Sequence, residues 1–482
     1  MIALLSGLAL AGPLAAESTG DIRFIGSQYT DFPVHAEGST VGQGFVVDQR
    51  FRLGGAVRAG DDFRAVAELD LFTGQVVGDP WDLSVTEDER ERHTLGAFDT
   101  ERIVLPRKLH VGGRLAGLDL QAGLDTSHWG LGMVANDGAH EPLFGRSDFG
   151  DRVLRTRLLT APLSRNVPIP WFIVVAGDYV IADDLMRASN GQRAMQGILS
   201  TFWTEGEGKI VGIYAVIRHQ VEPDGRLTDV VVLDASEDWT FDLGHVDLRI
   251  GSEAVGVTGR TSRALSYNAR DQLKVRTAGL ATHLALGDGG GLWTSHFRAG
   301  WASGDGNPDD DTTHDFSFDR DFDAGMVLFD EVGGAIDAGT YELLTDPQYS
   351  AEPPDGVDGL VSEGAFRRAS FLQTAFEVDP TDWLDLRVGS LVGWQSGPVA
   401  QPFYTFRAGG TPTNHADAPT DGYFLGTEVD WSIALSADPD DEWAAMPSLQ
   451  LQGGHALLGD NLVARGGPAT IHLITATGRV RW

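Results

Sequence analysis

The last thirteen residues, Thr470–Trp482, read TIHLITATGRVRW and alternate between apolar and polar side chains. One face carries Ile474, Ala476, Gly478, Val480 and Trp482. The other face carries Thr475, Thr477, Arg479 and Arg481. A period of two residues is typical of a β-strand whose two faces meet different surroundings. The segment therefore predicts a final strand that ends in an aromatic residue, although an ordinary edge strand ending in Trp has the same pattern.

The same alternation recurs through nearly the whole chain. Residues 372–378 and 384–392 alternate on either side of the turn sequence Asp379-Pro380-Thr381-Asp382, which predicts a hairpin with one apolar and one charged face. Residues 245–250 and 428–435 are divided in the same way. A soluble sheet packs its apolar face on a core, whereas a membrane barrel turns that face to lipid and lines its lumen with the polar face. Alternation alone does not separate the two.

The connections between the alternating runs are short and long in turn. Short turns fall near 59–62, 112–117, 161–168, 205–208, 236–239, 287–291, 379–382 and 437–442. Longer polar connections fall at 33–42, 74–100, 127–150, 182–191, 221–226, 253–267, 303–363, 397–421 and 458–467. Tight periplasmic turns and long external loops are typical of outer-membrane barrels. The sequence therefore predicts an all-β fold, a transmembrane antiparallel β-barrel of about 18 strands (roughly 16–18).

Composition and the first residues agree with a secreted membrane barrel. Residues 1–16 hold an apolar run that ends in Ala15-Ala16, which predicts a signal peptide, and residues 17–482 then form one barrel domain. Beyond residue 16 no apolar stretch suffices for a spanning helix, so a closed barrel is the remaining way to cross a bilayer. A formal net charge of −33 argues against a nucleic-acid partner. The absence of cysteine excludes disulfides and a cysteine nucleophile.

Residues 303–363 form a long acidic connection with 17 acidic residues and one basic residue, Arg320. A loop of this length is usually functional or disordered. Its apolar patch 326–329 predicts a loop anchored inside or over the barrel mouth, where it narrows the pore. Alternatively, Asp305, Asn307 and Asp309 offer oxygen ligands to a calcium ion, although the spacing lacks the glycine and distal glutamate of an EF-hand. A solvated loop facing the phosphates of lipopolysaccharide is the third possibility.

Charged side chains in the loop and on the inward strand faces are candidate pore residues. The loop candidates are Asp305, Asp309, Asp311 and Asp319, and those on the wall are Asp385, Arg387, Arg249 and Arg479. We predict that the loop carboxylates favour cations over anions. Ser127 and His128 are adjacent and would face opposite sides of a strand, the wrong geometry for a serine–histidine catalytic pair. We predict no catalytic residue and no cofactor apart from the possible calcium ion.

Two groups of motifs carry a family resemblance. WASGDGN at 301–307 and FDRDFDAGMVLF at 318–329 resemble a segment of alginate-export-like outer-membrane porins. HWGLGMVANDG at 128–138 and FGDRV at 149–153 resemble an uncharacterised deltaproteobacterial group of outer-membrane barrels. The motifs cover about a tenth of the chain. The resemblance implies a monomeric 18-stranded barrel and passive transport, although the acidity of this chain departs from the arginine-lined pore that such exporters use for a polyanion.

These observations together predict a porin-like channel in the outer membrane of a Gram-negative bacterium. It would give small or polymeric hydrophilic solutes a passive path for diffusion or export. Its other expected partners are outer-membrane lipid, lipopolysaccharide and the barrel-assembly machinery, for which Val480 and Trp482 form the insertion signature. Alternatives are a non-conducting structural or surface barrel, a barrel-embedded hydrolase and a soluble secreted β-protein.

Overall fold

The chain has 482 residues, and its computed structural model describes 14–30, 32–33, 40–41, 45–60, 62–77, 103–147, 150–162, 170–205, 208–264, 272–305, 310–350, 353–354, 356–360, 362, 364–437, 445–464 and 467–482. Most of residues 1–16, the predicted signal peptide, lie outside this part. Residues 14–16 lie in the first strand, where Leu14 pairs with Ala59.

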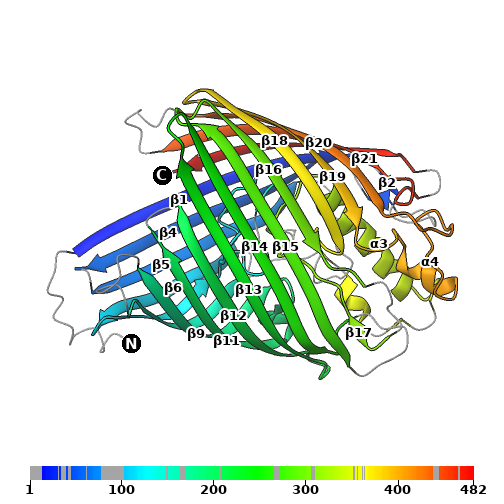
Figure 1. Cartoon of the computed structure of the whole chain (residues 1–482), viewed down its shortest axis with the longest axis horizontal. Helices are drawn as coiled ribbons and strands as arrows, with labels where there is room; N and C mark the ends of the chain where they lie inside the picture. Colours follow the sequence, from blue (N-terminus) through cyan, green and yellow to red (C-terminus); the bar gives the residue numbers. More distant parts are fainter. Residues whose placement is uncertain are drawn as a thin grey trace.

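Eighteen long strands, each paired with the next in antiparallel fashion, form a closed barrel among the described residues (Figure 1). They are β1 (Leu14–Tyr29), β4 (Phe45–Ala59), β5 (Phe63–Val77), β6 (Val104–Leu115), β7 (Leu118–Thr126), β8 (Arg152–Thr160), β9 (Trp171–Asp183), β11 (Arg193–Thr204), β12 (Lys209–Val221), β13 (Leu227–Asp242), β14 (Val246–Thr261), β15 (Leu273–Asp288), β16 (Trp293–Ala302), β18 (Ala369–Thr381), β19 (Leu384–Gln395), β20 (Phe424–Ser436), β21 (Met446–Leu458) and β22 (Thr470–Arg481). The predicted fold class and strand number are confirmed.

Short elements lie in the connections. The two-residue strands are β2 (Phe32–Pro33), β3 (Thr40–Val41), β10 (Met186–Arg187) and β17 (Thr312–Thr313). The helical elements are η3 (Ala188–Asn190), η4 (Leu328–Gly333), α3 (Gly334–Thr345), η5 (Val357–Leu360) and α4 (Pro402–Arg407). Within the described part of the chain, no helix has both the length and the apolar character needed to span a membrane.

The first and last strands close the barrel. β1 pairs with β22 from Asp21 opposite Arg481 to Tyr29 opposite Leu473, and with β4 on its other side. The backbones of Gly20 and Trp482 exchange hydrogen bonds of 3.0 and 3.1 Å at the end of this seam. Closure gives each of the eighteen long strands two neighbours, so the described barrel wall has no unpaired edge.

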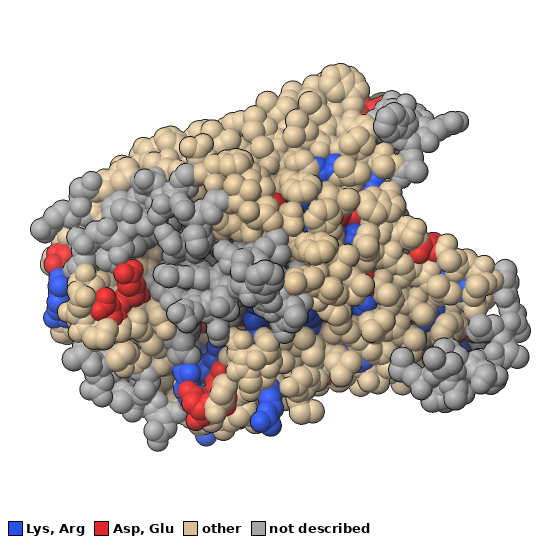
Figure 2. Space-filling model, turned by 180° about the vertical axis from the view of Figure 1, so that it is seen from behind, with Lys and Arg blue, Asp and Glu red and all other residues tan. Residues whose placement is uncertain are grey.

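Side chains alternate between the outside and the lumen as the pattern predicts. On β13, Leu233 points outward and is 59 % exposed, whereas the neighbouring Asp234 is fully buried inside. On β22, Ile474 is 48 % exposed and Thr475 is buried. Uncharged side chains cover most of the described surface in Figure 2. An apolar outside around a polar inside is the arrangement of a barrel that faces lipid.

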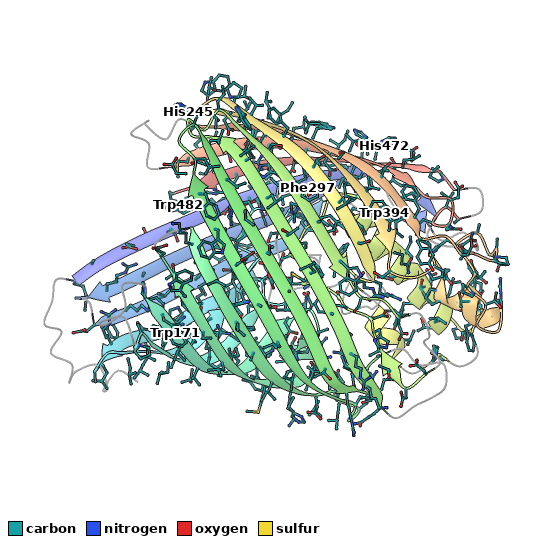
Figure 3. The ribbon with its side chains drawn as sticks, viewed as in Figure 1. Trp171, His245, Phe297, Trp394, His472 and Trp482 are labelled. Atoms are coloured by element: carbon teal, nitrogen blue, oxygen red, sulfur yellow. The ribbon has the colours of Figure 1, made fainter. Side chains whose placement is uncertain are left out.

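The short connections gather at one end of the barrel, here the short-turn end, and the long ones at the other, the long-loop end. Trp171 lies toward the short-turn end and Trp394 toward the long-loop end (Figure 3). The predicted connections at 236–239 and 253–267 were wrong, because β13 continues to Asp242 and β14 continues to Thr261. The turn predicted at 112–117 is also shorter, since β6 continues to Leu115. The polar residues of these segments lie at regular strand positions, so polarity alone suggested turns where the backbone stays extended.

Candidate functional site

The segment between β16 and β18 folds back and packs on the inner wall of the barrel. Met326, Val327 and Leu328 are buried in one cluster with inward side chains of β18–β22, which include Ala375, Leu391, Leu425, Ala456 and Ile471. An aromatic cluster continues this core, since Phe318 and Phe329 each pack edge-on against Phe366 with ring centroids 4.8 Å apart. The segment thus has a hydrophobic core of its own inside the barrel.

A carboxylate of the wall fixes the backbone of this segment. Glu428 points inward from β20, and its two carboxylate oxygens accept hydrogen bonds from the amides of Met326, Val327 and Leu328 at 2.6, 2.8 and 2.6 Å. Hydrogen bonds to an ionised acceptor are stronger than neutral ones. They also satisfy three amides that would otherwise be buried without a partner at the start of η4.

The segment between β7 and β8, residues 127–151, is held in a similar way. Glu253 points inward from β14 and accepts hydrogen bonds from the amides of Leu131 and Met133, the second at 3.2 Å. The two inward segments also contact each other, because the amide of Asp319 donates to the Met133 carbonyl at 2.8 Å and the Gly150 amide donates to Asp321 Oδ2 at 2.5 Å. The described residues of 127–151 and 303–368 form one body inside the barrel, called here the inner plug.

A cavity of about 950 Å³ lies between the inner plug, the wall from β8 to β15 and the connection at 395–412 that contains α4. Six aspartates and six arginines line it, so its formal charges balance. The aspartates are Asp151, Asp183, Asp184, Asp305, Asp315 and Asp319. The arginines are Arg187, Arg218, Arg263, Arg320, Arg367 and Arg368.

The acidic side of the cavity is built where β9 ends against the inner plug. Arg218 Nη1 lies 2.5 Å from Asp183 Oδ2, and Arg320 Nε lies 3.0 Å from Asp184 Oδ1. Burial raises the pKa of Asp184 to about 6, and burial beside Asp184 raises the pKa of Asp319 well above its usual range. Burial therefore disfavours the charged forms of Asp184 and Asp319.

Further arginines of the lining lie at the same long-loop end as Asp183 and Asp184. Arg263 follows β14 and lies 3.1 Å from Glu222, and its Nη1 donates to the Leu185 carbonyl at 2.6 Å. Arg367 lies 3.3 Å from Asp337 of α3, and Arg368 lies 3.6 Å from Asp315. These contacts hold the guanidinium groups at the cavity wall, where they can bind an anionic group.

The remaining inner wall, from β4 to β9, carries arginine–carboxylate pairs that connect neighbouring strands. Arg52 of β4 binds Asp70 of β5 through two hydrogen bonds of 2.6 and 2.8 Å. Arg155 of β8 binds Asp178 of β9 in the same two-pronged manner at 2.9 and 2.7 Å. Such planar pairs suit arginine better than lysine, which agrees with a chain that has only three lysines.

The structure separates the predicted pore residues. Asp305 and Asp319 line the cavity. Asp311 pairs with Lys274 at 2.7 Å instead, and Asn307 and Asp309 lie outside the described residues, so the calcium site stays a prediction. The predicted wall residues are bound in ion pairs away from the cavity, namely Arg249 with Asp238, Arg387 with Asp385 and Arg479 with Asp21 and Glu141. Val480 pairs with Ile22 and Pro447 in the seam.

Ser127 and His128 point to different partners. Ser127 Oγ accepts a hydrogen bond from Arg155 Nη2 at 3.0 Å. The imidazole of His128 stacks on that of His140, with ring centroids 4.0 Å apart, and its Nδ1 lies 3.8 Å from Asp137. The two side chains therefore do not form the nucleophile–base pair of a hydrolase in this conformation.

Sequence reasoning missed the residues that hold the inner plug and the arginines of the cavity. The alternating pattern marked Glu428 as facing the lumen, whereas it left Glu253 in the predicted connection 253–267. It gave no signal that their partners would be backbone amides more than 100 residues away, as for Glu428 and Val327. Arg263 and Arg367 lie in connections, where periodicity carries no information.

Comparison with known proteins bears on the fold. No family model and no curated protein matches the sequence. Among solved structures, OccAB1 of Acinetobacter baumannii matches with a TM-score of 0.51 and 9 % identity, over 96 % of this chain and 96 % of that one. The chain has the barrel fold of the Occ outer-membrane porins. OccK8 (OprE) of Pseudomonas aeruginosa matches at 0.50 with 9 % identity over 97 % and 98 % of the two chains. OpdK of the same organism, solved with vanillate, matches at 0.50 with 10 % identity over the same shares.

Proposed function

We propose that this protein is a channel of the Gram-negative outer membrane that lets small hydrophilic solutes diffuse passively. The observation that carries the proposal is the 950 Å³ cavity inside a closed barrel, lined by charged side chains and bounded by the inner plug. An aqueous path of this kind needs polar walls inside and an apolar surface outside, as the alternation of the strands provides. The Occ porin fold supports the same reading.

The charge pattern of the cavity favours solutes that carry both signs of charge. Within the lining, Arg263, Arg367 and Arg368 can bind a carboxylate, and Asp183 and Asp184 can bind an ammonium group. The cavity is in the size range of sites for small ligands. The likeness to OpdK, which was solved with the small carboxylate vanillate, supports solutes of this size.

Ion preference follows from the same balance. The sequence predicted a preference for cations, but the formal charges of the lining cancel, and burial raises the pKa of Asp184 and of Asp319. We therefore expect weak selectivity with a slight preference for anions. The reversal potential in a salt gradient across a planar bilayer measures this sign, and a strong cation preference would contradict it.

Polymer export is not part of the proposal, because the inner plug divides the lumen and leaves a cavity of small-molecule size. The alginate-export-like resemblance stays a prediction. We also propose that the protein has no enzymatic role, since Ser127 and His128 bind other groups. A non-conducting surface barrel is the alternative that a conductance measurement excludes or establishes.

Single-channel recording of the purified protein in planar bilayers tests the proposal. Arg263→Gln removes a charge from the cavity and should shift the reversal potential toward cations. Arg226→Gln is the matched control, because Arg226 lies in the neighbouring connection, pairs with Asp224 at 2.7 Å and is absent from the lining. A wild-type protein without unitary currents, or equal shifts from both variants, would refute the assignment of this cavity as the solute path.

A further inference from the structure

Two histidines and an aspartate of segment 127–151 lie together on the side of the inner plug that faces the short-turn end. His128, Asp137 and His140 each offer one ligand atom, and these three atoms lie within 4.8 Å of one another. Glu141, next in the chain, pairs with Arg481 at the end of β22 at 3.2 Å, which places the group in the part of the lumen near the short-turn end. The group is separate from the solute cavity, since none of the three residues lines it.

The distances in this group fit a small tetrahedral metal site. Nδ1 of His140 lies 3.2 Å from Asp137 Oδ1, and Nδ1 of His128 lies 3.8 Å from the same oxygen. A tetrahedral zinc ion with bonds of about 2.0–2.1 Å separates its ligand atoms by about 3.3–3.5 Å. The two imidazoles are stacked at an angle of 21°, so a rotation of the His140 ring is needed to direct both nitrogens at one ion. That ring is 64 % exposed, which permits the rotation.

The backbone around the three residues is fixed by the barrel wall. Arg107 of β6, which is almost fully buried, donates from Nη2 to the Asp137 carbonyl at 2.5 Å. The Ala139 amide donates to Asp137 Oδ1 at 3.0 Å and turns the chain so that His140 returns over the carboxylate. Beside His128, the Trp129 ring stacks on Tyr214 of β12 at 5.2 Å. Ligands on a braced backbone lose little freedom when they bind an ion, which favours binding.

We propose that His128, Asp137 and His140 form a binding site for a divalent transition metal, zinc in particular, in the lumen on the short-turn side of the solute cavity. Two imidazole nitrogens and one carboxylate oxygen are ligands that suit zinc, copper and nickel and do not suit calcium or magnesium. The fourth position is open to water, because the His140 ring is solvent-exposed and that of His128 is 25 % exposed. Binding at this site does not depend on the channel activity.

Titration of the detergent-solubilised full-length protein with zinc chloride tests the site by calorimetry. The wild type should bind one zinc ion at this group, and a tenfold excess of calcium chloride should not displace it. His140→Ala and His128→Ala should each weaken this binding at least about tenfold, since even loss of a supporting residue weakens metal sites by about 10–100-fold. The heat-modifiable mobility of each variant in gels checks that the barrel is folded.

His472→Ala is the matched control. His455 and His472 also form a close pair, with their Nδ1 atoms 2.7 Å apart, but they lie on β21 and β22 and carry no ligand of the proposed site. Retention of tight zinc binding in His472→Ala, together with its loss in the other two variants, supports the proposal. Equal zinc binding in the wild type and the His128 and His140 variants, or loss only in His472→Ala, would overturn it. Because calorimetry reads binding directly, a protein that does not conduct can still pass or fail this test.

Discussion

The contact between Glu428 and the inner plug gives the most specific prediction. Glu428→Ala removes the acceptor of three amide hydrogen bonds at 2.6, 2.8 and 2.6 Å. A hydrogen bond to a charged group contributes roughly 1.5–3 kcal/mol, so three independent bonds sum to roughly 4–9 kcal/mol. Burial of the four apolar side chains at 326–329 contributes a similar amount at roughly 1.5–3 kcal/mol each. We expect the plug to stay docked on average and to open far more often.

Two measurements follow from this magnitude. A loss of about 4 kcal/mol raises the open population by about 10³-fold, since every 1.4 kcal/mol is a factor of ten. A protease that cuts after glutamate should then cleave at Glu331 or Glu342 about 10³-fold faster while the barrel stays folded, provided that reclosing is faster than cleavage. Single-channel recordings should show a noisier and larger conductance.

A conservative variant and a control variant test this prediction further. Glu428→Gln keeps one acceptor oxygen without the charge and should have a smaller effect, because neutral hydrogen bonds contribute roughly 0.5–1.5 kcal/mol each. Glu237→Ala removes a glutamate from the outward face of β13 and should leave cleavage unchanged. If Glu428→Ala is cleaved at the wild-type rate and conducts as the wild type does, the carboxylate does not hold the plug.

Three other expectations concern the barrel and the plug. Gly20→Val should lower the temperature at which the folded gel band is lost, because a Cβ there would overlap the Trp482 ring, whereas Gly177→Val should not, since its Cβ would meet open space. Leu233→Arg, at an outward position, should destabilise the protein in bilayers by roughly 2–4 kcal/mol; a neutral effect in urea unfolding would contradict a lipid-facing wall. Burial raises the pKa of Asp330 to about 7, so the docked plug favours the protonated acid. Its stabilisation is present below about pH 4 and is lost as the pH rises through about 7, so protease cleavage should increase from pH 5 to pH 8 in the wild type and should increase less in Asp330→Asn.

The barrel was predictable because its determinants are local. Each outward residue, such as Leu233 or Ile474, faces lipid whichever strands lie beside it. Whether a position is apolar therefore depends on its place in the two-residue alternation and not on a distant partner. The largest errors fell at 236–239 and 253–261, where Glu237, Asp238 and Glu253 break the apolar pattern without ending the strand. In the folded barrel Asp238 pairs with Arg249, and Glu253 accepts hydrogen bonds from the amides of 131 and 133. The local sequence around these residues does not indicate such partners.

The sequence by itself determined the fold class, the alternation of short and long connections and the two faces of the wall, because these follow from a two-residue period and from turn composition. It also marked 326–329 as an apolar patch in an acidic segment. Only the tertiary structure decided that this patch docks under Glu428, that Glu253 holds the second segment and that six arginines meet six aspartates around one cavity. Those contacts join residues far apart in the chain, and their energies depend on burial and geometry that arise only when the barrel closes.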